Sequence, residues 1–178
     1  MRWLVFVFSL FLSQAVLAAG FTLRSTDFKP NKTIPMKYVF KGFGCTGQNV
    51  SPELHWSRAP AGTKSFAVTV YDPDAPTGSG WWHWVVYNIP ASVTQLSEDA
   101  STRGMPAGAV QNRNDFGTHQ YGGPCPPQGD KPHHYVFTVF ALDVPRFKLP
   151  ADASPAFVGF NLHFHTLAKA SFTARYGR

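Results

Sequence analysis

The chain is short of several features that define common protein classes. Among its 178 residues are only two cysteines, and only ten acidic residues stand against sixteen lysines and arginines. Cys45 and Cys125 lie far apart, so there is no CxxC pair for zinc or for disulfide exchange. The basic residues form no run, which gives nucleic-acid binding no support in spite of a net charge of +6. No internal repeat or low-complexity linker interrupts the chain, which predicts a single domain.

The one extended apolar run lies at the N-terminus. Arg2 precedes the run from Trp3 to Leu12, and small residues around Ala18 follow. This pattern predicts a secretory signal peptide, residues 1–18, that is cleaved; a short buried helix is the alternative. The run is too short for a transmembrane anchor, and no cysteine near the cleavage point offers a lipid anchor. We therefore expect a single mature domain of residues 19–178 that is periplasmic or secreted.

Export bears on the charge and on the cysteines. Cleavage removes Arg2 and no acid, so the net charge falls from +6 to +5, a modest positive balance that suits anionic ligands or surfaces. Two cysteines in an exported chain most economically form one disulfide, which predicts a bond between Cys45 and Cys125. Two free thiols are the alternative, because spacing alone does not prove geometry.

Short β-type segments dominate the rest of the chain. The clearest is 65–71, where both faces are largely apolar, as in a strand buried in the middle of a sandwich. The pattern predicts an all-β-dominated fold, an antiparallel β-sandwich of Greek-key type with a peripheral C-terminal helix. The expected strands are 21–28, 34–40, 54–56, 65–71, 82–89, a short one near 109–111, 135–142 and 171–176.

Helical periodicity occurs only near the C-terminus. Apolar residues recur there at spacings of three, four and three: Phe157, Phe160, Phe164 and Leu167. Ser154 is placed to cap the helix, and Pro155 suits its first position, where a missing N–H costs nothing. His163 and His165 diverge at helical spacing, and we interpret them as structural.

Two stiff loops between strands carry the ionisable groups, and such loops are where folds commonly place function. The first runs from 71 to 90, and Asp72 and Asp74 open it. In an extended loop both carboxylates point the same way, and they could serve as general acid and base, as metal ligands or as partners of histidine. Ordinary turn formation is the alternative, with a cis bond before Pro73 or Pro76 as one way to fix the turn.

Histidines follow the acids in both loops. His83 is flanked by three tryptophans at a strand entrance, so its ring is expected to be partly desolvated; of His133 and His134, one should face inward. With Asp72, they could form a pocket for phosphate or carboxylate. A catalytic zinc site is the alternative, although neither loop has HxH or HExxH spacing. A serine nucleophile lacks its Gly-x-Ser-x-Gly context, and Asp115-Phe116-Gly117 is a chance match to a kinase tripeptide.

Two motifs give a resemblance to a known family. Tyr71-Asp-Pro-Asp-Ala-Pro76 with Trp81-Trp82-His83, then Gly123-Pro-Cys-Pro-Pro-Gln-Gly129 with His133-His-Tyr135, resemble the phosphatidylethanolamine-binding protein family, also called the Raf kinase inhibitor-like proteins. The likeness extends over essentially the whole mature chain and is strongest to the exported bacterial branch. It implies a β-sandwich with a small pocket for phosphate, acetate or a phospholipid-type headgroup, with no established catalysis, no cofactor and no metal.

The resemblance also implies which residues bind the ligand. Pro76 and Pro127 would form pocket walls, and Gly123 would start a loop that lends backbone N–H groups to the anion. Cys125 stands where the family often has glycine, so a disulfide to Cys45 would tether the pocket loop, and His134 replaces a common arginine. The expected ligand-binding residues are Asp72, Asp74, Pro76, His83, Gly123, Pro127, His133 and Tyr135.

Three functions follow. The leading one is an exported binding protein for a small anionic ligand, without catalysis, which on this interpretation needs at least one protonated histidine. The alternative is a protein that inhibits or regulates a protein partner, in the manner of a protease or kinase inhibitor, through its surface. The third is a hydrolase or metalloenzyme that uses the same Asp and His cluster.

Overall fold

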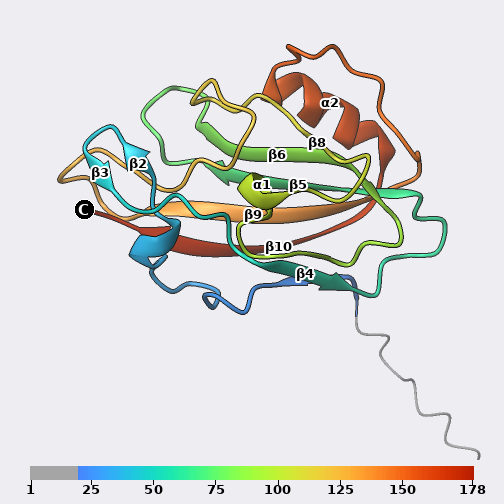
Figure 1. Cartoon of the computed structure of the whole chain (residues 1–178), viewed down its shortest axis with the longest axis horizontal. Helices are drawn as coiled ribbons and strands as arrows, with labels where there is room; N and C mark the ends of the chain where they lie inside the picture. The colour runs from blue at the N-terminus through green and yellow to red at the C-terminus, as the bar shows by residue number, and fades with distance from the viewer. Residues whose placement is uncertain (1–19) are drawn as a thin grey trace, which may run out of the picture.

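The fold is built on one antiparallel sheet of five strands. The computed structural model describes residues 20–178, so the predicted signal peptide lies outside the described residues. The strand order is β10-β9-β5-β6-β8 (Figure 1). β5 is nearly all buried and pairs with β6 on one side and β9 on the other, as its two apolar faces predict. These strands are β5 (Ser65–Asp72), β6 (Trp81–Pro90), β8 (Val110–Gln111), β9 (His133–Leu142) and β10 (Thr166–Tyr176).

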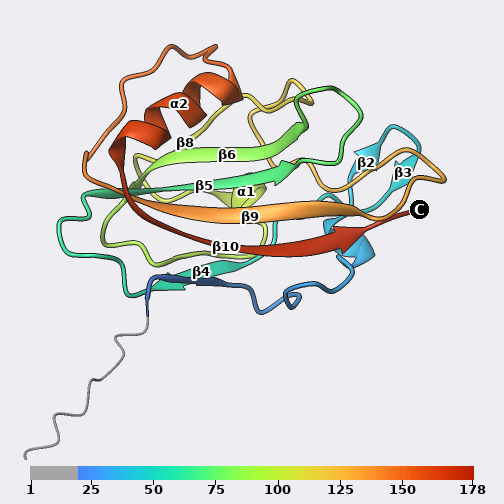
Figure 2. The same ribbon diagram turned by 180° about the vertical axis from the view of Figure 1, so that it is seen from behind.

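A smaller sheet covers one face of the large one. Its order is β1-β4-β7, from β1 (Thr22–Arg24), β4 (Leu54–Ser57) and β7 (Gln95–Leu96). The main hydrophobic core fills the space between the two sheets and includes Trp56, Phe66, Trp84 and Phe137. A hairpin of β2 (Lys41–Gly42) and β3 (Cys45–Thr46) projects at one end of the molecule, and Figure 2 shows it near the C-terminus. This architecture confirms the predicted all-β-dominated sandwich.

A helix covers the opposite face of the large sheet. α2 (Pro155–His165) packs Val158 and Leu162 into a second core, with Ala67 and Val85 of the sheet. Its N-terminus forms as predicted, because the Ser154 side chain accepts a hydrogen bond from the Phe157 N–H at 3.1 Å. One further short helix, α1 (Ala100–Arg103), lies beside β8. No helix within residues 20–178 has the length and apolar character needed to span a membrane.

The apolar stripe of α2 faces solvent instead of the core. Phe157, Phe160 and Phe164 are 45, 59 and 65% exposed, while Leu167 belongs to β10. The helix contacts the sheet through Val158 and Leu162, which have helical spacing but lie on another face. Phe160 and Phe164 instead pack edge-to-face, with ring centroids 4.9 Å apart. Periodicity therefore located the helix but gave no information about which apolar face would be buried.

Two N-terminal strand predictions need correction. Residues 34–40 are not a strand, because the Tyr38 N–H bonds back to the Pro35 carbonyl and forms a 3-10 turn, η1 (Met36–Tyr38). In the 21–28 segment only β1 pairs with another strand. The prolines of the first loop follow trans bonds, since no peptide bond of the described residues is cis.

The two cysteines are bonded to each other, as predicted. The disulfide joins Cys45 on β3 to Cys125 on the second loop, with a sequence separation of 80. It links the projecting hairpin to the body of the domain. On the chain-entropy account, a loop of this length restricts the unfolded chain strongly.

We predict that loss of the disulfide lowers the free energy of unfolding by about 4–5 kcal/mol. Urea denaturation of the wild type with and without reductant measures the difference. A Cys45→Ser/Cys125→Ser variant is the control. Its urea midpoint should resemble that of the reduced wild type and should not change when reductant is added. Equal midpoints for oxidised and reduced wild type would contradict the prediction.

Candidate functional site

The predicted site residues meet at one end of the large sheet, where β5 ends and where β6 and β9 begin. A cavity of about 210 Å³ lies there. A larger depression of about 910 Å³ runs between β1 and β10, but no histidine, acid or tyrosine of the described residues lines it. Another, of about 790 Å³, contains only Asp74 and His133 of the predicted ligand-binding residues. The smaller cavity is therefore the candidate site. It is lined by six of the predicted ligand-binding residues, namely Asp72, Pro76, His83, Pro127, His133 and Tyr135.

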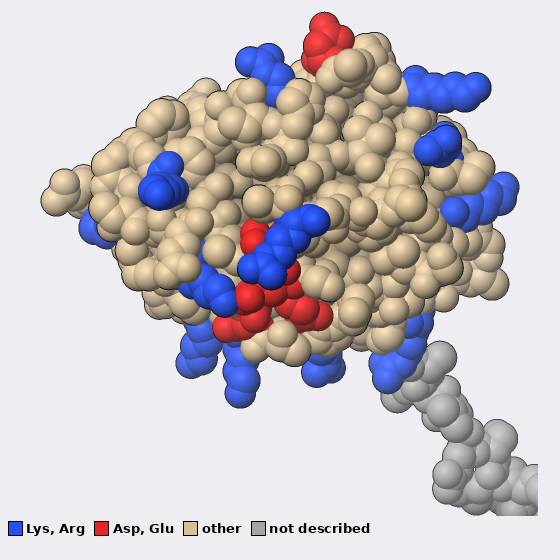
Figure 3. All heavy atoms as spheres, in the orientation of Figure 1, with Lys and Arg blue, Asp and Glu red and all other residues tan. Residues whose placement is uncertain are grey.

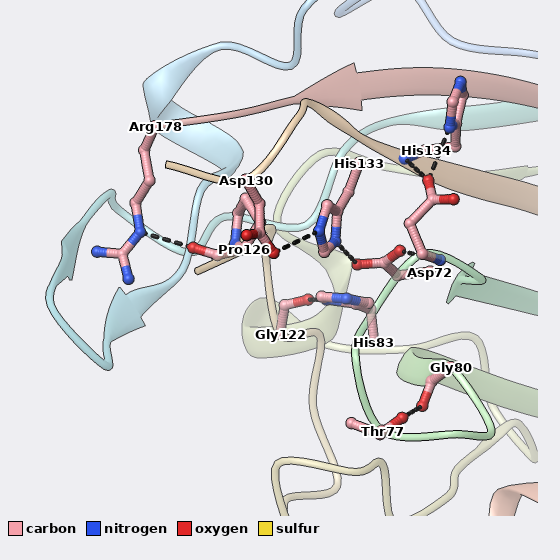
Figure 4. A network of polar contacts seen from close by, with 11 residues as sticks. Asp72, Thr77, Gly80, His83, Gly122, Pro126, Asp130, His133, His134 and Arg178 are labelled. Atoms are coloured by element: carbon pink, nitrogen blue, oxygen red, sulfur yellow. Dashed lines mark hydrogen bonds and ion pairs between the residues drawn. The ribbon is translucent and has the colours of Figure 1, made fainter. Parts of the chain in front are cut away.

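A buried acid and histidine connect two of the strands. Asp72 at the end of β5 and His133 at the start of β9 are 3 and 4% exposed, and the His133 Nδ1 lies 2.7 Å from Asp72 Oδ2 (Figure 4). The other Asp72 oxygen accepts the Asp74 N–H at 2.8 Å. The His133 Nε2 lies 3.4 Å from an Asp130 carboxylate oxygen. The ring thus has a carboxylate at each nitrogen, and these carboxylates can compensate a positive charge on it.

His83 is held in a different state from His133. Its Nδ1 donates to the Gly122 carbonyl at 2.7 Å, and its ring packs edge-on against Phe116 and Tyr135 at 5.3 and 5.1 Å between centroids. Burial lowers the pKa of His83 to about 4, and the Gly122 carbonyl and Asp72 oppose that shift only in part. His83 is therefore neutral at physiological pH, and it cannot supply the protonated histidine that we expected from the sequence.

Two hydrogen-bond donors in the cavity wall have no partner. The Tyr135 hydroxyl and the Trp81 Nε1 are buried and make no hydrogen bond within residues 20–178. Burial raises the pKa of Tyr135, so its hydroxyl keeps its proton. An unpaired buried polar group costs on the order of 1–3 kcal/mol, and native proteins leave few of them without a reason. Two such donors in one small cavity indicate a ligand that accepts hydrogen bonds.

The first loop is fixed by its own hydrogen bonds. The Tyr71 hydroxyl donates to the Ser79 carbonyl at 2.7 Å, and the Thr77 hydroxyl donates to the Gly80 carbonyl. Gly80 has a φ of +70°, and a Cβ there would meet the Tyr71 hydroxyl at 2.2 Å. Only glycine fits this turn, which carries the chain from Asp72 back to Trp81 on β6.

The second loop forms the opposite wall and is held from several directions. The Cys45–Cys125 disulfide joins it to β3, the Phe40 N–H donates to the Pro124 carbonyl at 3.1 Å, and the Arg178 Nε donates to the Pro126 carbonyl at 2.7 Å. The walls of the cavity are therefore largely set before any ligand arrives, which lowers the entropic cost of binding.

Two predicted ligand-binding residues lie outside the cavity. The Gly123 N–H donates to the Asn49 side chain at 2.7 Å and so is not free for an anion. Gly123 is needed for packing instead, because a Cβ would meet the Tyr38 carbonyl oxygen at 2.1 Å. Asp74 turns away from Asp72 and accepts the His134 N–H and ring N–H, each at 2.7 Å. Burial alone would raise the pKa of Asp74, but these bonds outweigh it and lower that pKa.

Three aromatic residues of the cavity were missed. Trp81 stood inside the stretch that we singled out, so its presence could have been expected. Phe116 and Phe43 come from segments with no motif, and they meet in a cluster with Phe40, where the Phe40 and Phe116 rings are 4.3 Å apart. Among residues 20–178, no three side chains of His, Cys, Asp or Glu are arranged to hold a metal ion.

The fold is a β-sandwich with a small, partly enclosed cavity at one end of its large sheet, and comparisons with known proteins assign it to a family whose membership supports a small binding protein. The sequence profile described as phosphatidylethanolamine-binding protein matches residues 24–177. YbcL of Escherichia coli (strain K12) is 53% identical over 169 residues, which are 93% of this chain and 92% of that protein. YbhB of the same organism is 52% identical over 86% of this chain and 98% of its own length.

Solved structures agree with the sequence comparisons. The crystal structure of E. coli YbcL, described as a new member of the mammalian PEBP family, superposes with a TM-score of 0.87 and covers 90% of this chain and 99% of that one. A phosphatidylethanolamine-binding protein homologue from Chlamydia trachomatis, 32% identical, gives a TM-score of 0.74 over 89% of this chain and 98% of its own. The chain belongs to the phosphatidylethanolamine-binding protein family.

The burial of His83 predicts how stability depends on pH. Because its folded pKa, about 4, lies below the ordinary value of 6.5, the unfolded chain binds more protons between these values. Stability should fall by about 3 kcal/mol as the pH drops from 6.5 to 4 and then level off for this group. Urea denaturation between pH 7 and pH 4 should show this slope, and His83→Asn should flatten it. An unchanged slope in the variant would assign the effect to other groups. Asp74 also contributes to the free energy of unfolding, because the pKa of its carboxyl is lowered in the folded protein. That contribution would be lost only as the pH falls below the ordinary pKa of an aspartate, which is below the range in which His83 acts.

Proposed function

We propose that this chain is an exported binding protein whose cavity takes a small anionic group, such as phosphate, a carboxylate or a phospholipid headgroup, without catalysing a reaction. The observation that carries the proposal is the pair of unpaired buried donors, the Tyr135 hydroxyl and the Trp81 Nε1, beside the Asp72–His133 pair. Hydrogen bonds from such donors to an ionised acceptor are about twice as strong as neutral ones.

The remaining walls suit a group that is polar at one end. Beside the polar residues, the cavity is lined by Phe43, Phe116, Pro126 and Pro127, and by no lysine or arginine of the described part of the chain. An anionic head would meet the donors, while an apolar substituent would contact the rings. Export is supported by the signal-peptide pattern of residues 1–18 and by the disulfide, because disulfides persist in oxidising compartments.

The alternative function is that of an inhibitor or regulator of a protein partner. No contact within residues 20–178 favours a particular partner, so this stays a prediction from the resemblance. The binding experiment separates the two functions. If the folded wild type bound none of the anions, the cavity would no longer explain the function, and the surface would become the better candidate.

We predict that the mature wild type binds phosphate and phosphoethanolamine in calorimetric titration, and that Tyr135→Phe weakens binding by roughly 10- to 100-fold. The reason is the loss of one hydrogen bond to a charged group, about 1.5–3 kcal/mol. Tyr87→Phe is the matched control, because Tyr87 is buried under α2 in the second core and loses the same hydroxyl. Equal weakening in both variants would argue against the proposed contact.

A further inference from the structure

One edge of the large sheet is open along part of its length. Within residues 20–178, β10 pairs with β9 on one side and with no other strand on the opposite side. Arg175 turns its backbone to this outer edge, where its N–H and its carbonyl bond to residues 32–34. Alternate residues of a strand point their backbone groups the same way, so Lys169 and Ser171 also present theirs here. Neither makes a backbone hydrogen bond at this edge within the described part of the chain.

The two ends of this edge are protected, and the middle is not. At the start of β10 the register with β9 shifts between Thr166 and Ala168, an irregularity of the kind that turns an edge away from further pairing. At the end of the strand, Thr33 forms a bridge with Arg175. Lys169 and Ser171 lie between these features, and both are exposed. An unpaired stretch of edge is a template for pairing with another chain.

A depression lies along the same stretch. It is the space of about 910 Å³ between β1 and β10, and it extends over residues 170–173 of β10 and over the loop 29–31. Phe21, Leu23 and Phe172 give it an apolar lining. Because every second side chain of a strand points to the same face, a strand added beside β10 would place alternate side chains against this lining. An extended segment with apolar residues at every second position therefore fits it.

The charge of the depression selects among such segments. Arg24 and Lys29 line it and are exposed, and no aspartate or glutamate of the described residues does so. Neither basic residue forms an ion pair within residues 20–178. Lys169 adds a third positive charge at the open edge, where a lysine discourages indiscriminate pairing. A strand with carboxylates between its apolar residues compensates these charges.

A second copy of this chain suits the surface less well. Two copies that met through the same patch would bring Arg24 and Lys29 of both together. Like charges placed against each other at an interface oppose association. The occupant that the charges favour is therefore a different chain, with an excess of acidic residues.

We propose that the open edge of β10 binds an acidic, extended segment of a partner protein, which joins the large sheet as an additional strand. Its backbone bonds to Lys169 and Ser171, its apolar side chains lie in the depression, and its carboxylates meet the basic rim. Main-chain bonds supply affinity in this mode of recognition, and the alternate side chains supply specificity. The depression shares no lining residue with the cavity that Tyr135 lines, so the inference goes beyond the proposed anion-binding function and does not depend on it.

Two synthetic peptides of eight residues test the preference for acidic segments. One alternates glutamate with valine, the other alternates lysine with valine, and both are capped at their ends. They are titrated into the mature wild type at low ionic strength and followed by calorimetry. The glutamate peptide should bind roughly tenfold or more tightly, because the basic rim attracts it and repels the other. Equal affinities, or no binding of the glutamate peptide, would overturn the proposal.

Hydrogen exchange locates the bound peptide. At a peptide concentration of about ten times the dissociation constant, the amide N–H groups of Lys169 and Ser171 should exchange roughly tenfold more slowly. The amides of β8, at the opposite edge of the same sheet, should keep their rates. Binding without protection at Lys169 and Ser171 would mean attraction by charge alone and would contradict strand pairing. If the free wild type were a dimer with these amides already protected, a second copy would occupy the edge, and the proposal would be wrong.

Backbone methylation tests the pairing from the side of the peptide. In an added strand the N–H groups of alternate residues face β10, and the others face away. One version of the glutamate peptide carries N-methyl groups on all its valines, and a second carries them on all its glutamates. One version should lose binding and the other should keep it, because only one set of N–H groups bonds to β10. Equal affinities of the two versions would rule out an added strand.

Charge reversal tests the basic rim with a matched control. Arg24→Glu/Lys29→Glu should weaken binding of the glutamate peptide roughly tenfold or more and should make the lysine peptide the better ligand. Arg146→Glu/Lys148→Glu changes the net charge equally at exposed residues outside the depression, and its preference should match that of the wild type. The same loss of preference in both variants would assign the effect to net charge and overturn the proposed site. Tyr135→Phe should leave peptide binding unchanged, which separates this surface from the anion cavity.

Discussion

The arrangement of the site depends on the buried bond between Asp72 and His133. These residues lie at the end of β5 and the start of β9, two strands that pair along most of their length. Burying a carboxylate costs several kcal/mol unless hydrogen bonds compensate it, and here the His133 ring and the Asp74 N–H do so. Replacing such a pair by apolar residues is often neutral or stabilising, so its presence in a well-packed sandwich is weak evidence of added stability. It fixes the direction of the His133 ring, and it leaves the neighbouring side chains to face the cavity.

The walls of the site are rigid for reasons that lie outside it. The turn that ends in Gly80 returns the chain to β6, and the disulfide holds the second loop against the β2–β3 hairpin. Arg178, far along the chain from this loop, bonds to the Pro126 carbonyl. Both loops are rich in proline, which has little backbone freedom to lose on folding. A cavity with walls held in this way can place single donors and acceptors precisely enough to discriminate between ligands of similar size and charge.

The sequence predicted the class of fold and the place of the site, because both depend on local patterns. Strands with two apolar faces identified the central sheet, and the two motifs identified the loops. The directions of side chains in those loops could not be predicted in the same way. Asp74 was expected beside Asp72 on the assumption of an extended chain, but the Asp72 carboxylate bonds the Asp74 N–H and turns the loop. The partner of the Gly123 N–H, Asn49, is 74 residues away, and Phe116 reaches the cavity from an irregular segment. Long-range contacts of this kind have no signature at one position of the chain.

The net positive charge of the molecule does not extend to the lining of the cavity. The chain is basic, yet Figure 3 shows lysine and arginine side chains spread over the face in view, and none of those within residues 20–178 lines the cavity. Around the cavity, Asp72 and Asp130 balance or exceed any charge on His133, so a bound anion would meet no excess of positive charge. The distributed charge can attract an anion from a distance, where salt weakens its effect. On the proposed function, an anion inside the cavity would be held by fixed dipoles at a partly enclosed site, where single hydrogen bonds are worth more than in solution. Selectivity in such a cavity must follow from the pattern of donors and acceptors, because there is no surplus charge to hold every anion alike.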